Sequence, residues 1–180
     1  MPFTASLGEI RSLLSAVERQ SVSDASTVAS RVVSSVTTDS RDVKKGALFV
    51  ARKGETSDGH LYVRSAFQQG AAACLVDAAW LQSAAAAELL ERLRTEDKSS
   101  TPLTLLGVND TTIAFGDLAR YWRRKLALQT LTVSGSNGKT TTKEMLRVLL
   151  TEIRGPGTAS AKSFNNHIGL PQTILNASTT

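Results

Sequence analysis

The chain has 180 residues, 41% of them hydrophobic, and a formal net charge of +5. This composition supports a packed core and excludes a chain that is disordered throughout. The positive excess suits an anionic ligand, but it forms no basic run, which argues against binding to nucleic acid. The single cysteine, Cys74, excludes an internal disulfide and a cysteine-cluster metal site. No signal peptide or apolar run of ~18 residues is visible, so we expect a cytoplasmic protein without a membrane span.

The first hundred residues alternate predicted helices and strands. Ser6 and Glu9 form a capping box at the start of the first helix. Short β-branched or apolar runs indicate strands, and Gly70 is a typical helix terminator. Asp77 is expected to cap an alanine-rich helix. The predicted order is helix, strand, strand, helix, strand, helix, at residues 6–17, 32–37, 47–51, 60–69, 72–76 and 79–94.

The rest of the chain continues the alternation. Asp110 is a predicted N-cap, and Pro171 fits the first turn of a helix. The predicted order is strand, helix, strand, helix, helix, at residues 103–108, 110–125, 131–133, 140–153 and 171–175. This pattern predicts an α/β protein. We expect a small N-terminal α/β domain at residues 1–109, followed by the start of a parallel-sheet domain of the phosphate-loop type at residues 110–180.

A glycine loop precedes the helix predicted at 140–153. Its members are Gly135, Ser136, Asn137, Gly138, Lys139, Thr140 and Thr141. Glycines let backbone N–H groups point at a phosphate, and the helix N-terminus adds partial positive charge. In such a loop Lys139 reaches the β- and γ-phosphates of ATP, and the Thr140 hydroxyl is placed to bind Mg²⁺. Two residues separate the glycines instead of four, so a plain strand-to-helix turn with a surface lysine is the alternative interpretation.

Four sequence blocks resemble the Mur ligase family, which assembles the peptide of bacterial cell-wall precursors. They occur in the family's order and cover most of the chain from Thr38 onward. The blocks are GSNGKTTTKEM at 135–145, SFNNHIGLPQT at 163–173, the group TDSR, GALFVA and GETSDGH within 38–60, and VNDT at 108–111.

The resemblance implies a uridine-binding N-terminal domain followed by an ATP-binding domain. The glycine loop and the paired asparagines look most like the family member that adds D-Ala-D-Ala to UDP-N-acetylmuramoyl-tripeptide, and we expect it to be a monomer. In that reaction ATP converts the tripeptide carboxylate to an acyl phosphate, which the dipeptide amine attacks. Lys139 is the implied catalytic residue, and it neutralises charge on the phosphoryl group together with Mg²⁺ held partly by Thr140.

The same resemblance implies a set of residues that bind the UDP substrate. They are Thr38, Ser40, Arg41, Glu55, Thr56, Ser57, Asn165 and Asn166. Other roles stay open for them: the hydroxyl groups can stabilise turns, Arg41 can pair with Asp39 instead of a phosphate, and the asparagines can form Asx turns. The two histidines, His60 and His167, are expected to be structural or to lie on the surface.

Complete Mur ligases are much longer than this chain. We therefore expect an N-terminal portion that does not catalyse ligation alone. Two alternatives remain. The first is the sister ligase that adds the third peptide residue, against which Ser136 and the Asn165–Asn166 pair argue. The second is a non-catalytic module that binds the UDP substrate.

Overall fold

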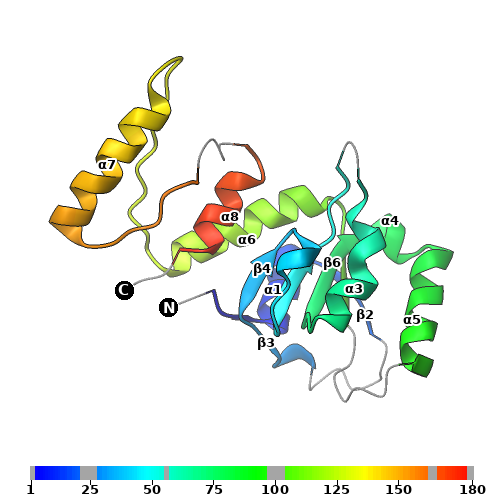
Figure 1. The fold of residues 1–180 in the computed structure, drawn as a ribbon. Coiled ribbons are helices and arrows are strands. Elements are labelled where there is room, and N and C mark those ends of the chain that lie inside the picture. The colour runs from blue at the N-terminus through cyan, green and yellow to red at the C-terminus, as the bar shows by residue number, and fades with distance from the viewer. Residues whose placement is uncertain (1–2, 21–27, 55–56, 97–103, 162–165, 178–180) are drawn as a thin grey trace.

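The computed structural model describes residues 3–20, 28–54, 57–96, 104–161 and 166–177 (Figure 1). A β-sheet with helices on both faces forms the body of the molecule, and α7 stands away from it. The elements are β1 (Ala5–Ser6), α1 (Leu7–Leu14), β2 (Val17–Gln20), β3 (Val32–Val33), β4 (Ser35–Thr37), η1 (Ser40–Asp42), β5 (Ala47–Val50), η2 (Gly59–Tyr62), α3 (Val63–Gln68), β6 (Ala73–Asp77), α4 (Ala78–Leu81), α5 (Ala84–Glu96), β7 (Thr104–Val108), α6 (Thr111–Lys125), α7 (Lys139–Arg154) and α8 (Gly169–Leu175).

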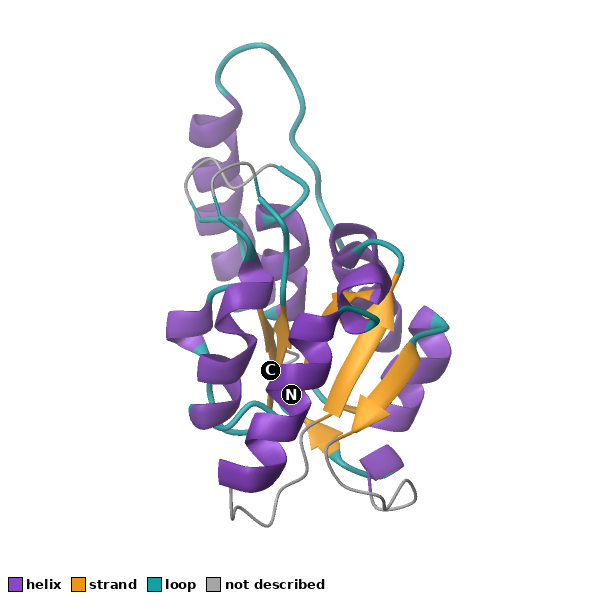
Figure 2. Ribbon diagram, turned by 90° about the vertical axis from the view of Figure 1, so that its right-hand side faces the viewer, coloured by secondary structure: helices purple, strands orange, loops and turns teal. Residues whose placement is uncertain are grey.

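The main sheet has the strand order β2-β7-β6-β5-β4 and is visible in Figure 2. Strands β4 to β7 run parallel, and β2 pairs antiparallel with β7. β5 consists entirely of buried residues, as does β6 up to Val76, which is typical of parallel strands covered on both faces. The predicted α/β class is therefore confirmed. β1 and β3 form a separate two-stranded sheet.

Two hydrophobic clusters fill the two faces of the sheet. Helices α1, α6 and α8 cover one face, and the members that they contribute include Ile10, Phe115, Leu118, Trp122 and Leu175. Helices α3, α4 and α5 cover the other, with Val63, Ala66, Leu81, Leu90 and Leu93. Cys74 lies in the second cluster, and burial raises the pKa of its thiol well above the usual value. Cys74 therefore serves as a small buried side chain of the core.

The first predicted helix is too long. The capping box of Ser6 and Glu9 is present as expected, with Glu9 N donating to Ser6 Oγ and Ser6 N donating to Glu9 Oε2. However, Ser15 takes a left-handed φ of 49° and ends α1. Val17 then begins β2 and pairs with Gly107, so the prediction that it continues the helix is wrong.

Two other predicted elements are each divided. The strand predicted at 32–37 is split into β3 and β4, which belong to different sheets. The helix predicted at 79–94 is split into α4 and α5 at Ser83, whose hydroxyl donates to Trp80 O and accepts from Ala86 N. Asp77 occupies the N-cap position of α4 but makes no side-chain cap bond.

The C-terminal part of the chain returns to the sheet through α6 and α8. Asp110 caps α6 as predicted, accepting from Thr112 N and Ile113 N. The two helices lie side by side (Figure 1), and Trp122 Nε1 donates to Ala177 O at 3.0 Å. The boundary proposed at residue 109 stays a prediction, although both helices follow it in the sequence and pack on the sheet that precedes it.

Residues 131–133 do not form the predicted strand. A strand needs a neighbour for its hydrogen bonds, and no strand among the described residues lies beside this segment. The predicted helix that follows is present as α7, but none of its residues is buried. Its exposed apolar side chains are Met145, Val148, Leu149 and Ile153. Within the described ranges, no helix is both long and apolar enough to cross a membrane.

Gly107 provides a test of the packing between β7 and α4. A Cβ atom at this position would lie 2.6 Å from Leu81 Cδ2 and 3.4 Å from Ala78 Cα. We expect Gly107→Ala to lower the free energy of unfolding by about 1–3 kcal/mol, because a close-packed core resists added atoms. The matched control is Gly116→Ala in α6, where a Cβ would meet nothing within 4 Å. It should be neutral or stabilising by up to about 1 kcal/mol. Urea unfolding measures the free energy of unfolding of both variants. Equal changes in the two variants would contradict the close contact between Gly107 and α4.

Candidate functional site

The carboxyl ends of the four parallel strands share one edge of the sheet. Ligands of open α/β sheets bind outside this edge. β4 is followed by the turn at residues 37–41, β5 by a hairpin whose described residues are 51–54 and 57–59, β6 by α4, and β7 by Asp110 and α6. The sequence-predicted substrate residues 38–41 and Ser57 are thereby brought to the same edge.

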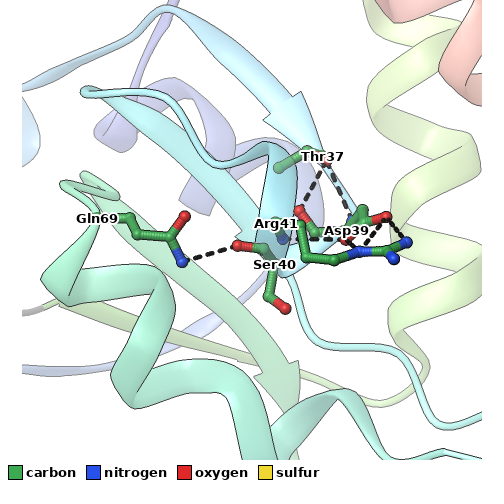
Figure 3. Close-up of polar contacts among 5 residues, drawn as sticks. All are labelled: Thr37, Asp39, Ser40, Arg41 and Gln69. Atoms are coloured by element: carbon green, nitrogen blue, oxygen red, sulfur yellow. Dashed lines mark hydrogen bonds and ion pairs between the residues drawn. The ribbon is translucent and has the colours of Figure 1, made fainter.

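The turn after β4 is held by its own polar groups (Figure 3). Asp39 N donates to Thr37 Oγ1 at 3.1 Å, and Arg41 N donates to Asp39 Oδ1 at 2.9 Å. The Arg41 guanidinium folds back over the same carboxylate, with Nε 2.9 Å from Oδ1 and Nη2 2.6 Å from Oδ2. The sequence left open whether Arg41 pairs with Asp39 or with a phosphate, and in the structure it pairs with Asp39.

Electrostatics in this turn follow from that pairing. The side-chain hydrogen bond from Arg41, followed by the bond from its backbone N–H, lowers the pKa of Asp39 to about 2. The Arg41 side chain is 87% exposed, so an incoming anion can reach it. Within the described part of the chain, the hydroxyl groups of Thr38 and Ser40 make no hydrogen bond, while Ser40 O accepts from Gln69 Nε2.

The hairpin after β5 is closed at its base by Gly59. Gly59 N donates to Arg52 O, and a Cβ at this glycine would lie 2.6 Å from Arg52 N, so no larger residue fits. Arg52 Nε donates to Thr112 Oγ1, which joins the hairpin to the start of α6. Ser57 is exposed, with its carbonyl accepting from Gly54 N. Glu55 and Thr56, two of the predicted substrate ligands, lie outside the described residues.

His60 fastens the hairpin to the end of β6, a role that sequence reasoning left unspecified. Its ring is buried and lies 5.0 Å from that of Trp80. Nε2 accepts from Asp77 N at 3.0 Å, so the proton of the neutral ring sits on Nδ1, which lies 2.6 Å from Asp58 Oδ1. The histidine is structural, as expected. The D-G-H order of residues 58–60 was the signal available in the sequence.

The glycine loop has the backbone that its sequence predicts. Gly135 and Gly138 have φ values of 147° and 75°, and α7 begins directly after Gly138 without a side-chain cap. Lys139 Nζ donates to Gly135 O at 2.6 Å and to Ser136 O at 3.1 Å. The uncapped amides at the start of α7 fit a phosphate group.

Thr140 is exposed at the start of α7, and its hydroxyl suits an oxygen-binding cation such as Mg²⁺. Among the residues that the structure describes, no group of three or more His, Cys, Asp or Glu side chains could hold a metal ion.

The paired asparagines precede α8. Asn165 lies outside the described residues. Asn166 Oδ1 accepts from Ile168 N at 3.1 Å and from Gly169 N at 2.8 Å, which makes an Asx turn at the start of α8. The carboxamide oxygen is thus used within the fold, and the amide nitrogen is the part of Asn166 that remains for a ligand.

Comparison with known proteins identifies the class to which this fold and these sites belong. The profile described as "Mur ligase family, catalytic domain" matches residues 32–103, and "Mur ligase middle domain" matches residues 133–180. The chain belongs to the Mur ligase family.

Two relatives in that family carry the same name. A UDP-N-acetylmuramoyl-tripeptide–D-alanyl-D-alanine ligase from Bacillus subtilis is 37% identical over 145 residues, which are 80% of this chain and 28% of that protein. The protein of the same name from Escherichia coli is 36% identical over 144 residues, 78% of this chain and 26% of the other. The chain therefore spans only about 28% of the length of these relatives.

Solved structures agree with the fold. MurF from Acinetobacter baumannii superimposes with a TM-score of 0.71 at 24% identity, covering 97% of this chain and 33% of that one. MurF from Thermotoga maritima, solved in complex with ADP, gives a TM-score of 0.59 at 29% identity, with coverage of 79% and 29%.

The pairing of Arg41 with Asp39 predicts how the turn responds to pH. The pKa of Asp39 lies below the usual 3.8, so this pair stabilises the fold fully above about pH 4 and ceases to do so as the pH falls towards 2. In Arg41→Ala, we expect the pKa of Asp39 to rise towards 3.8, because only the backbone bond remains. Carboxyl ¹³C NMR titration measures the change, with Arg92→Ala as the control. A pKa of Asp39 that stays near 2 in Arg41→Ala would contradict the assigned cause.

Proposed function

We propose that this chain carries the UDP-substrate site and the phosphate loop of an ATP-dependent ligase that joins D-Ala-D-Ala to UDP-N-acetylmuramoyl-tripeptide. The observation that carries the proposal is the glycine loop at the start of α7, in a chain whose relatives from Bacillus subtilis and Escherichia coli bear that name. The γ-phosphoryl group of ATP passes to the tripeptide carboxylate and ADP leaves. The dipeptide amine then attacks the acyl phosphate, with release of phosphate and a proton, to form the amide.

The phosphate loop binds ATP through backbone N–H groups and Lys139. MurF from Thermotoga maritima was solved in complex with ADP, which supports nucleotide binding by this chain. In the proposal, Lys139 turns its ammonium group from Gly135 O and Ser136 O to the β- and γ-phosphates and neutralises charge there. Mg²⁺ would supply further charge neutralisation, and Thr140 is the ligand that this chain offers it. Ser136, Asn137 and Thr141 complete the loop.

The UDP substrate lies, in this proposal, along the edge where the parallel strands end. Thr38 and Ser40 offer hydroxyl groups, and Arg41 offers a guanidinium that shares Asp39 with an incoming phosphate. Glu55, Thr56 and Ser57 line the uridine pocket in this proposal. Asn165 and Asn166 meet the muramoyl end, and Asn166 does so as a donor, because its oxygen caps α8.

The proposal also retains two expectations from the sequence. ATP and nucleotide-linked precursors are found in the cytoplasm, so the protein acts there. It acts as a monomer. The support for both is the sequence and the family resemblance.

Two separate binding sites imply that single substitutions affect one ligand each. Lys139→Gln should weaken ATP binding by about 10- to 100-fold, the usual size of a lost charge-assisted hydrogen bond. It should leave the affinity for UDP-N-acetylmuramoyl-tripeptide within about twofold. Arg41→Gln should do the reverse, with a loss of about 10-fold for the UDP substrate. Isothermal titration calorimetry with each ligand measures both affinities.

Arg92→Gln is the matched control, because its ion pair with Glu88 lies within the exposed surface of α5. It should change neither affinity. If Arg41→Gln and Lys139→Gln weakened the same ligand, the assignment of the two sites would fail. Absence of UDP-substrate binding in the unchanged chain would reject the proposed function itself.

A further inference from the structure

Two glutamine side chains hold the turn after β4 from opposite faces of the sheet. Gln69, at the C-cap of α3, donates from Nε2 to Ser40 O at 2.9 Å (Figure 3). Gln172, in α8, donates from Nε2 to Val36 O at 3.0 Å. The two carbonyl oxygens flank the segment 37–39. One helix packs on each face of the sheet, so the turn is fixed at both ends.

The strand that leads into the turn needs such support. β4 has three residues and, among the strands that the structure describes, pairs with β5 alone, so one side of it is an edge of the sheet. A half-buried carbonyl on that side loses contact with water and must find another donor. Gln172 supplies this donor to Val36 O, one residue before the Thr37 hydroxyl that receives Asp39 N.

The amide of Gln172 is itself held in place. Its Nε2 also donates to Asn176 Oδ1 at 3.2 Å, so both of its hydrogens face acceptors and the orientation of the amide is fixed. α8 is anchored by Leu175, which is 2% exposed, and by the bond from Trp122 Nε1 to Ala177 O. Gln172 is therefore a rigid support for the turn.

We propose that Gln69 and Gln172 form a glutamine clamp that positions the turn at residues 37–41 for an anionic, nucleotide-linked ligand. The ligand part of this inference rests on the proposed function. Both glutamines are positioning residues, because they bond to the backbone of the turn and leave the hydroxyl groups of Thr38 and Ser40 free to meet the ligand.

The clamp also links two predicted substrate segments that are far apart in the sequence. Asn166 caps the N-terminus of α8, and Gln172 projects from the next turn of the same helix to Val36 O. The short helix α8 thus fixes the distance between Asn166 and the turn at 37–41. A substrate that touches both segments meets them at a separation that α8 sets.

Backbone NMR relaxation tests the clamp without any ligand. In Gln172→Met and in Gln69→Met, which keep side-chain length but remove the donor, order parameters of Asp39, Ser40 and Arg41 should fall from about 0.85 towards values below about 0.6. Gln68→Met is the matched control, because Gln68 is an exposed neighbour in α3, and Gln69 rather than Gln68 bonds to the turn. It should leave the order parameters unchanged. In Gln172→Lys, whose amine can still donate to Val36 O, they should recover.

The indole N–H resonance of Trp122 verifies that α8 stays docked, since this proton is donated to Ala177 O. If Gln172→Met shifts that resonance, α8 has moved. The order parameters of Gln69→Met then test the clamp, because this substitution leaves α8 untouched. Unchanged order parameters in Gln69→Met, or in a Gln172→Met protein with α8 docked, overturn the clamp.

Uridine diphosphate is the probe for the functional consequence. Each clamp variant should bind it about fivefold more weakly, the usual effect of one lost hydrogen bond, while ATP affinity stays unchanged. Loss of order in the turn with full affinity for uridine diphosphate would reject the positioning role. If the unchanged chain does not bind uridine diphosphate, the proposed function fails, and the relaxation data still decide whether the clamp exists.

Discussion

Burial of the parallel strands on both faces is the constraint on which the rest of the structure depends. β5 and β6 are filled with apolar side chains because helices cover both sides of the sheet. Polar groups can then gather only where the strands end. The turn at 37–41, the hairpin at 51–59 and Asp110 are all placed by this rule, although none of them is adjacent to another in the sequence.

Features that depend on nearest neighbours could be predicted from the sequence. The capping box of Ser6 and Glu9 and the N-cap of Asp110 are formed by atoms two or three residues apart. The glycine loop belongs to the same group, since the positive φ values of Gly135 and Gly138 and the start of α7 are set locally. Strands β5 and β6 could also be predicted from the sequence. Because both faces of the sheet are buried, β5, and β6 up to Val76, are continuous apolar runs without alternating polar residues.

Features that depend on distant partners could not be predicted. Val17 has the spacing of a helical residue, yet it pairs with Gly107 as part of a strand. The left-handed conformation of Ser15, which ends the helix, could not be predicted because serine rarely adopts it. Residues 131–133 show the opposite case: the sequence is apolar and β-branched, but strand structure requires a neighbour. The contact between Gln172 and Val36, 136 residues apart, has no signal in a single sequence.

The two halves of the candidate site are organised before any ligand arrives, but by different means. The turn at 37–41 is fixed by bonds that a ligand need not break, since the clamp and Thr37 act on the backbone. The phosphate loop is closed by Lys139, whose ammonium group bonds to Gly135 O and Ser136 O. A phosphate must compete with these carbonyls for the ammonium group or share it with them. The ammonium group has three N–H donors, and one of them remains to bond a phosphate. In the proposed function, binding at the turn therefore adds contacts to a prepared surface, whereas binding at the loop requires Lys139 to exchange or share its contacts with Gly135 O and Ser136 O.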